Sequence, residues 1–289
     1  MSGPLLTVDA PSLLYRAYFA LPSSIKGTDG RPVNALLGTA NLVLQAVERY
    51  APRAVALCFG AEAAHYRTDL YPSYHADRPP MPDDLEHQWQ DAPAFFTAFG
   101  WTVHHAGDLE ADDLLGAFAR GEEQAGGTAI LFTGDRDMFQ CVTPSVTVLF
   151  PKGGKDGPEL IDVDGVRERY GIDPEQVPDF IALRGDPSDG LPGAKGIGEK
   201  GAKDLLREHG SLEALIAAAQ QPVPPLKPRV VGTLIDQADE LRAFHDIASL
   251  RPIDVERPAD APLDAAAAAS AARERGMNRL ADRLDALAD

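Results

Sequence analysis

The first 150 residues alternate short apolar runs with segments of helical periodicity, and this alternation restricts the chain to few folds. Apolar runs that suit buried strands occupy residues 4–10, 53–59, 101–106, 128–133 and 145–150. Segments with the apolar spacing of a helix occupy residues 13–21, 35–50, 91–100 and 111–124. Strands that alternate with helices form a mostly parallel sheet covered by helices. We therefore predict an α/β fold for this half.

The second half has a different pattern, because helical segments bounded by Gly or Pro replace the alternation. These segments occupy residues 164–171, 173–185, 198–210, 211–220 and 229–250. The Ala-rich tail over 261–288 predicts a further packing helix. We predict a core domain over residues 1–160 and a helical domain over 161–289. Residues 60–90, rich in Pro, Asp and Tyr, interrupt the core, and so long an irregular insertion is usually functional or mobile.

The composition limits the partners and the compartment. With 27 Lys and Arg against 44 Asp and Glu, the formal net charge is −17. This argues against a general nucleic-acid coat, because phosphate binding is driven by Lys and Arg, but it allows a local basic track. No apolar run approaches the roughly 18 residues that a membrane span needs. Cys58 and Cys141 lack CxxC spacing, so they suggest neither a zinc site nor a disulfide framework. We expect a monomeric cytoplasmic protein that does not contact a membrane.

Acidic residues gather where the predicted strands end. They comprise Asp9, Glu110, Asp112, Asp113, Asp135, Asp137, Asp186 and Asp189, the last two from the helical half. The carboxyl ends of parallel strands meet at one edge of the sheet, where ligands bind. Clustered carboxylates destabilise one another unless a cation neutralises them. Oxygen ligands without a His or Cys set favour Mg²⁺ or Mn²⁺, and two such ions suit phosphoryl displacement. Helix N-capping remains an alternative role for Asp112 and Asp113.

A glycine-rich segment in the helical half contains Gly196-Ile-Gly198-Glu-Lys-Gly201, a formal G-x-G-x-x-G. A dinucleotide site needs a strand before this motif, whereas here a loop rich in Pro and Asp precedes it, so that interpretation fails. A glycine turn between two helices, with Lys195, Lys200 and Lys203 nearby, can hold phosphates through backbone N–H groups. An ordinary helix–helix turn with surface lysines is the alternative.

Six segments, taken in order, resemble the 5′ nuclease (flap endonuclease) family, which includes the amino-terminal domain of bacterial DNA polymerase I. They are "LLTVDAPSLLYRAYFALP", "YRTDLYPSYHADRPPMPDDL", "LEADDLLG", "TGDRDMFQCV", "RGDPSDGLPGAKGIGEKGAKDLL" and "HGSLEAL", spread over residues 4 to about 220. No polymerase domain follows in the sequence, so we expect a free-standing nuclease.

The resemblance implies a PIN-like core, a helical arch at about 66–95 and a helix–three-turn–helix DNA clamp at about 175–210. It implies that the eight acids hold two or more Mg²⁺ or Mn²⁺ ions, directly or through water. The implied catalytic residues are Arg67, near the scissile phosphate, and His75 and Arg78, which lie with Tyr74 at the base of the arch. The implied clamp consists of Gly193, Gly196 and Gly198, with a K⁺ ion, and of Lys195 and Lys200 beside the duplex. The implied substrates are DNA with 5′ flaps, nicks or 5′ ends, in replication and repair.

Two residues depart from the family pattern. Gly60 stands where the family has a metal-binding Asp, and Glu62 or, less well, His65 could replace it. His75 stands where the family generally has a Lys, and histidine is mostly neutral at pH 8, which weakens its help to a phosphate.

Three functions remain open at this point. The first is a structure-specific 5′ nuclease, and the second is a nuclease-derived protein that binds branched or flapped DNA but barely cuts it. The third, a PIN-like ribonuclease, is disfavoured because the glycine clamp suits a B-form backbone. The number of remaining acids favours an active enzyme.

Overall fold

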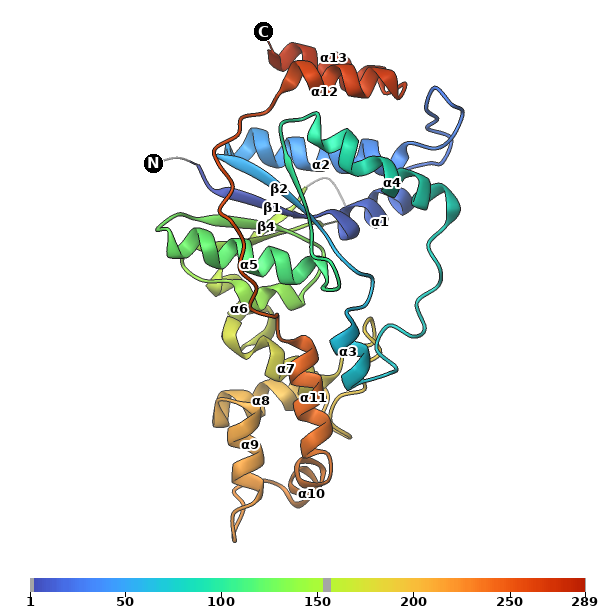
Figure 1. The fold of residues 1–289 in the computed structure, drawn as a ribbon. Coiled ribbons are helices and arrows are strands. Elements are labelled where there is room, and N and C mark those ends of the chain that lie inside the picture. The colour runs from blue at the N-terminus through green and yellow to red at the C-terminus, as the bar shows by residue number, and fades with distance from the viewer. Residues whose placement is uncertain (1–2, 153–156, 289) are drawn as a thin grey trace.

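The structure, a computed structural model, describes residues 3–152 and 157–288 and has a six-stranded sheet at its centre (Figure 1). The strand order is β3-β2-β1-β4-β5-β6. The strands are β1 (Leu5–Asp9), β2 (Ala54–Phe59), β3 (Thr102–His105), β4 (Ala129–Phe132), β5 (Val146–Phe150) and β6 (Glu159–Ile161). The first five strands run parallel, and β6 pairs antiparallel with β5. The prediction of a mostly parallel sheet is confirmed. The sequence did not predict β6, because three residues are too few to show a period.

Helices cover both faces of the sheet. In the first half they are α1 (Ala10–Ala20), α2 (Asn34–Tyr50), α3 (His65–Leu70), α4 (Asp83–Thr97) and α5 (Ala111–Gln124). In the second half they are α6 (Val163–Tyr170), α7 (Val177–Arg184), α8 (Glu199–His209), α9 (Leu212–Ala219), α10 (Pro228–Asp236), α11 (Ala238–Ala248), α12 (Ala265–Glu274) and α13 (Asn278–Ala288). Short 3₁₀ helices form at η1 (Asp137–Cys141) and η2 (Pro174–Gln176). None of the described helices is long and apolar enough to cross a membrane.

The alternation of side chains along each strand fills two cores. In β1, Leu6 and Val8 join the core under α1, α2 and α4, whereas Leu5 joins the core on the opposite face, under α5. All five residues of β1 are buried, as expected for a strand with helices on both sides. The strand ends at Asp9, where the chain leaves the sheet and enters α1.

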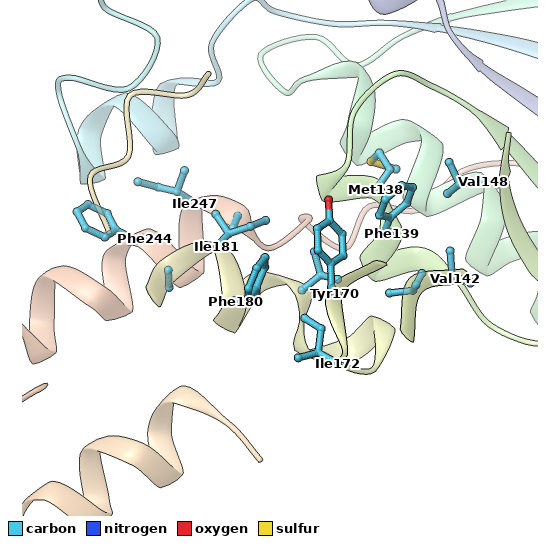
Figure 2. Close-up of a cluster of buried hydrophobic side chains, with 14 of the residues drawn as sticks. Met138, Phe139, Val142, Val148, Tyr170, Ile172, Phe180, Ile181, Phe244 and Ile247 are labelled. Carbon is cyan, nitrogen blue, oxygen red and sulfur yellow. The ribbon is translucent and has the colours of Figure 1, made fainter. Parts of the chain in front are cut away.

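The core under α5 continues into the helical half (Figure 2). Met138 and Phe139 of η1 and Tyr170 of α6 lie between the sheet and Phe180 of α7, and Phe244 of α11 extends the cluster further. Each fully buried side chain of this size contributes about 1.5–3 kcal/mol. This continuous packing fixes the loops of the helical half relative to the edge of the sheet.

The tail does not stay with the helical half. After α11 an extended segment over residues 249–264 runs back past α5 and leads to the α12–α13 hairpin, which packs beside α4 (Figure 1). Arg275 Nε donates to Asp91 of α4 at 2.5 Å, and Arg283 binds Glu48 of α2 at 2.7 Å. Gly276, with φ +77°, turns the chain between the two helices. The predicted packing helix is thus a hairpin whose buried side chains join the core of the first half.

Candidate functional site

A cavity of about 940 Å³ lies between the carboxyl edge of the sheet and the helical half. Seven of the eight predicted acids line it: Asp9, Glu110, Asp112, Asp135, Asp137, Asp186 and Asp189. Arg67, Tyr74, His75 and Arg78 also line it. The structure therefore brings together residues that the sequence scatters over 180 positions, and it leaves out Asp113 and the glycine turn.

Asp9, Asp135 and Asp137 are positioned by the ends of β1 and β4. The Asp9 carboxylate accepts hydrogen bonds from Ser12 N at 2.9 Å and from Thr133 Oγ1 at 2.6 Å. The first bond caps α1, and the second ties the end of β1 to the end of β4. Asp135 accepts from Asp137 N at 2.8 Å, so this turn aims both carboxylates into the cavity.

The electrostatics of the cavity disfavour ionised acids. Burial, followed by the repulsion of Asp135 and Asp9, raises the pKa of Asp112 well above its ordinary value. Burial and the Asp135 and Asp189 carboxylates do the same to the pKa of Asp137. Burial and then Asp189 raise the pKa of Asp135 to about 7. The acids of β1, of α5, of the loop after β4 and of the α7–α8 loop thus raise one another's pKa across one shared cavity.

The carboxylate oxygens that line the cavity are suitable ligands for a hard divalent cation. The carboxylates of Asp112 and Asp137 accept no hydrogen bond from any described residue. Within residues 3–152 and 157–288, no three His, Cys, Asp or Glu side chains are close enough to enclose an ion unaided. Mg²⁺ commonly keeps several waters and binds one or two carboxylates together with substrate phosphates. The wide cavity matches such an open, hydrated arrangement better than a closed protein cage.

Glu110 is already occupied by protein donors. Ala64 N donates to Glu110 Oε1 at 2.7 Å, and Tyr74 Oη donates to Oε2 at 3.0 Å. Arg67 Nη1 pairs with the same Oε2 at 2.9 Å. Glu110 also forms the N-cap of α5, so it holds α3 and the following loop against that helix.

Asp113 points away from the cavity. Its side chain is 0% exposed and meets Arg67 Nη1 at 3.4 Å and the Arg251 backbone N–H at 2.8 Å. It also accepts from Glu110 N at 3.2 Å, which completes a capping box at the start of α5. The sequence groups Asp113 with the metal ligands, because it is one of the acids that gather where the predicted strands end. Its three-residue spacing from Glu110 instead lets Asp113 cap the helix, so for Asp113 the capping alternative matches the geometry.

Arg67 connects these acids to the helical half. Its side chain is 4% exposed, and its Nε donates to the carbonyl of Ile247 in α11 at 2.9 Å. No sequence pattern links Arg67 to Ile247, because 180 residues separate them. The guanidinium therefore reaches the cavity wall in a fixed position.

Gly60 has no room for a side chain. A Cβ at this position would lie 2.4 Å from Ala111 N and 2.5 Å from Glu110 C. Ala61 N donates to Leu109 O at 2.8 Å, and this hydrogen bond holds the segment after Gly60 against the start of α5. The exposed Glu62 lines the cavity near Tyr15, whose pKa is raised by burial and then by the Glu62 carboxylate. His65 is exposed on α3 and does not line the cavity.

The segment that links α3 to α4 is docked on the loop between α7 and α8. His75 Nε2 lies 3.1 Å from Asp189 Oδ1, and Arg78 Nη2 donates to the same oxygen at 3.2 Å. The His75 ring stacks on Tyr74 with centroids 3.8 Å apart. His75 has φ +56°, a conformation that few non-glycine residues adopt. The predicted arch region thus consists of α3, a non-helical linker over residues 71–82 and α4.

The glycine turn joins α7 and α8 outside the cavity. Gly193 has φ +70°, and a Cβ there would lie 2.3 Å from Gly185 N, so the turn requires glycine. Gly196 has φ +79°, and Gly198 forms the N-cap of α8 without a side chain. Lys195 and Lys200 are exposed on this turn and on the first turn of α8. The predicted turn between two helices is confirmed as a structure.

Known proteins share both the sequence and the fold. The family of the 5′-3′ exonuclease N-terminal resolvase-like domain matches residues 4–171, and that of the 5′-3′ exonuclease C-terminal SAM fold matches residues 172–273. A 5′-3′ exonuclease of Streptomyces coelicolor is 38% identical over 77% of this chain and 78% of its own length. DNA polymerase I of Pseudomonas aeruginosa is 38% identical over 83% of this chain, and the thermostable DNA polymerase I of Thermus thermophilus is 41% identical over 74%. The chain spans 26% and 25% of the lengths of these two polymerases.

Solved structures match almost the whole chain. The T5 D15 protein co-crystallised with metal ions has a TM-score of 0.69 at 16% identity and covers 99% of this chain and 100% of its own. The catalytic core of Rad2 in complex with a DNA substrate has a TM-score of 0.65 at 14% identity and covers 98% and 91%. At these identities the likeness shows the fold. Together with the two domain matches and the relative from Streptomyces, it places the chain in the 5′-3′ exonuclease family.

Proposed function

We propose that the protein is a structure-specific 5′ nuclease, with both 5′-3′ exonuclease and 5′-flap endonuclease activity. It hydrolyses DNA phosphodiesters near a junction of single strand and duplex and leaves a 5′-phosphate. Its substrates are DNA with 5′ flaps, nicks or 5′ ends in replication and repair, and it acts as a monomer. The observation that carries the proposal is the group of seven acids on one cavity, in which Asp112 and Asp137 accept no hydrogen bond from the described residues.

The acids would hold two or more Mg²⁺ or Mn²⁺ ions. Asp9, Asp112, Asp135 and Asp137 face the cavity from the sheet side, and Asp186 and Asp189 face it from the helical side. When bound, such ions neutralise phosphate charge and activate water at neutral pH. Asp113 takes no part in this assignment, since Arg67 and the Arg251 amide occupy it.

The cationic side chains would orient the substrate. Arg67 presents a fixed positive charge at the cavity wall, where it can stabilise charge that develops on the scissile phosphate. Arg78 has a side chain 41% exposed, so it can leave Asp189 and meet a phosphate of the entering 5′ strand. Tyr74 and His75 form the stacked base of that entrance. The glycine turn, with Lys195, Lys200 and a K⁺ ion, would hold the duplex backbone.

A second function is favoured by one specific feature. Gly60 cannot carry a ligand, and the neighbouring Glu110 is bound to Ala64, Tyr74 and Arg67. A site with one carboxylate missing and another occupied would bind its ions weakly. The protein would then recognise branched or flapped DNA and cut it slowly.

One assay separates the two functions. A 5′-flap DNA labelled at its 5′ end is incubated with Mg²⁺, with Mn²⁺ or with EDTA, and the variant Asp135→Asn is compared with Asp108→Asn. Asp108 is exposed near the same rim but does not line the cavity. We expect metal-dependent cutting near the junction, slowed on the order of 10²-fold or more by Asp135→Asn and unchanged by Asp108→Asn. Tight flap binding without cutting would support the binding protein instead.

A further inference from the structure

A side chain outside the cavity connects the loop that carries Asp137 to the helical half. The amide of Gln140, in η1, donates to the carbonyl of Asp137 at 2.9 Å and to the carbonyl of Ala248 at 2.9 Å. Its oxygen accepts a hydrogen bond from Leu250 N at 3.3 Å. A glutamine amide has two N–H donors and one carbonyl oxygen, so both donors and the oxygen have partners. Gln140 does not line the cavity, whereas all three of its partners do.

The end of α11 that Gln140 contacts is itself held on both sides. Ala248 is the last residue of α11, where the carbonyls lack partners within the helix. The carbonyl before it, that of Ile247, accepts from Arg67 Nε at 2.9 Å. Just beyond the helix, Arg251 N donates to a carboxylate of α5 at 2.8 Å. Gln140 therefore attaches the loop after β4 to a fixed point of the helical half.

The loop needs such an anchor, because the acids around it repel one another. Burial, followed by the Asp135 and Asp189 carboxylates, raises the pKa of Asp137 well above its ordinary value. The 3₁₀ helix η1 has only five residues, and the poorer hydrogen bonds of such a helix resist this repulsion weakly. Asp137 N donates to Asp135 Oδ1 at 2.8 Å, but that bond uses a carboxylate oxygen that a cation would also need. Gln140 instead holds Asp137 through its carbonyl and leaves the acids free.

We propose that Gln140 is a positioning residue, which ties the backbone of Asp137 to the end of α11 and so keeps the Asp137 carboxylate directed into the cavity, toward a divalent ion. The inference rests on the proposed function and adds to it a residue that is not a ligand of the ion. Gln140 acts through the backbone of Asp137. Removing a partner of this kind, one step behind a metal ligand, typically lowers metal affinity or activity by about 10- to 100-fold.

The test measures the affinity of the full-length protein for Mn²⁺ by calorimetry, without DNA. Gln140→Met removes the amide and nearly preserves the side-chain volume. Gln140→Asn keeps an amide on a side chain that is one methylene shorter, so that it cannot reach both carbonyls. Urea unfolding of each variant reports any loss of stability.

The matched control is Gln176→Met, because Gln176 of η2 makes the same kind of contacts. Its amide donates to the carbonyls of Leu206 at 3.3 Å and Gly210 at 2.6 Å, and its oxygen accepts from Asp173 N at 2.9 Å. Both glutamines are partly exposed, but Gln176 and its three partners lie within the helical half and do not line the cavity. The control therefore reports what the loss of such bonds does to stability alone.

We expect Gln140→Met to raise the Kd for Mn²⁺ roughly tenfold, with a smaller rise in Gln140→Asn. Gln176→Met should lower the urea midpoint by a comparable amount and leave this Kd unchanged. In the cutting of 5′-flap DNA, Gln140→Met should shift the Mn²⁺ dependence to higher concentrations by the same factor, which a loss of stability alone does not do.

Two outcomes overturn the inference alone, provided that the wild-type protein binds Mn²⁺. One is an unchanged Kd in both Gln140 variants, and the other is an equal rise in Gln176→Met, which would assign the effect to stability. A wild-type protein that binds no Mn²⁺ overturns the proposed function as well.

Discussion

At the scale of single residues, the acids of the cavity oppose folding when no cation neutralises them. Burial and then the Asp189 carboxylate raise the pKa of Asp135 to about 7, from an ordinary value of 3.8. Between these values the folded protein binds more protons than the unfolded chain, so its stability falls as the pH rises from about 4 to 7. We expect Asp135→Asn to raise the free energy of unfolding of the metal-free protein at pH 8 by on the order of 1–2 kcal/mol. At pH 4, where Asp135 is largely protonated, the gain should shrink toward zero.

Urea denaturation in EDTA at both pH values measures this difference, with Asp108→Asn as the control at an exposed position. A loss of stability in Asp135→Asn at pH 8 would contradict this prediction. It would mean that hydrogen-bond donors of the protein already stabilise the ionised Asp135 carboxylate in the absence of a cation.

Gly60 yields a second prediction at this scale. Because a Cβ would meet backbone atoms of Ala111 and Glu110 at 2.4–2.5 Å, Gly60→Ala should cost about 1–3 kcal/mol of stability. Gly60→Asp should cost at least as much and should not increase Mn²⁺ affinity, as measured by calorimetry. Gly232→Ala in α10 is the matched control, since no atom lies near that Cβ, and helix propensity predicts a gain of up to about 1 kcal/mol. Tighter Mn²⁺ binding by a stable Gly60→Asp protein would contradict this account.

The sequence predicts the positions of the acids better than their partners. Asp9 ends the buried strand β1 and Asp135 comes shortly after β4, so the edge of the sheet brings them together without further information. For Asp113, its place among the clustered acids allows metal binding and its place at the start of a helix allows capping, and the choice depends on Arg67 and Arg251. The contact between Asp113 and Arg251 spans 138 residues, and no local pattern reports a contact of that range.

At the scale of elements, α2 depends on a side chain from α4 for its N-terminus. Val33 precedes α2 and supplies no side-chain cap. Instead, buried Gln88 accepts from Ala35 N at 2.7 Å and Leu36 N at 3.3 Å, and its amide donates to Asn34 Oδ1 at 3.2 Å. Gln88→Leu should cost about 2 kcal/mol or more, because it leaves buried N–H groups without an acceptor.

Hydrogen exchange at Ala35 and Leu36 should accelerate in Gln88→Leu along with the loss measured in urea. The control is Gln90→Leu, on an exposed turn of the same helix, which should change the stability by less than about 0.5 kcal/mol. Equal effects of the two variants would show that α2 does not need the cap.

Element types were more predictable than element partners. The five parallel strands lie within a residue or two of their predicted bounds, because burial on both faces makes each one a continuous apolar run. The pairing of α2 with α4 through Gln88 had no such signal, since a glutamine in an amphipathic helix is usually exposed. The same holds for the tail, whose Ala-rich pattern predicts a helix but not the helices that it packs against.

At the scale of the whole molecule, the segment over residues 249–264 connects the helical half to the hairpin beside α4, and a buried arginine holds it. Arg53 donates to the carbonyl of Pro258 at 2.6 Å and to Asp260 at 2.9 Å, and it pairs with buried Glu122 of α5. Arg257 of the segment also pairs with Glu122, at 2.9 Å. The segment is thus tied to both the sheet and α5.

The two arginines share one acid but differ in burial, and this difference yields the last prediction. Arg53 has a side chain 1% exposed, whereas that of Arg257 is 44% exposed. Arg53→Met should cost about 3–5 kcal/mol, because it leaves the buried Glu122 charge with a single partner at the surface. Arg257→Met should cost less than about 1 kcal/mol, because Arg257 lies half exposed at the surface and buried Glu122 keeps its pair with Arg53. Urea unfolding measures both losses, and in Arg53→Met the amides of α12 and α4 should exchange faster, since the hairpin loses its tether. Similar losses in the two variants would instead mean that the segment is held by its surface pairs, and that the hairpin docks on α4 independently of Arg53.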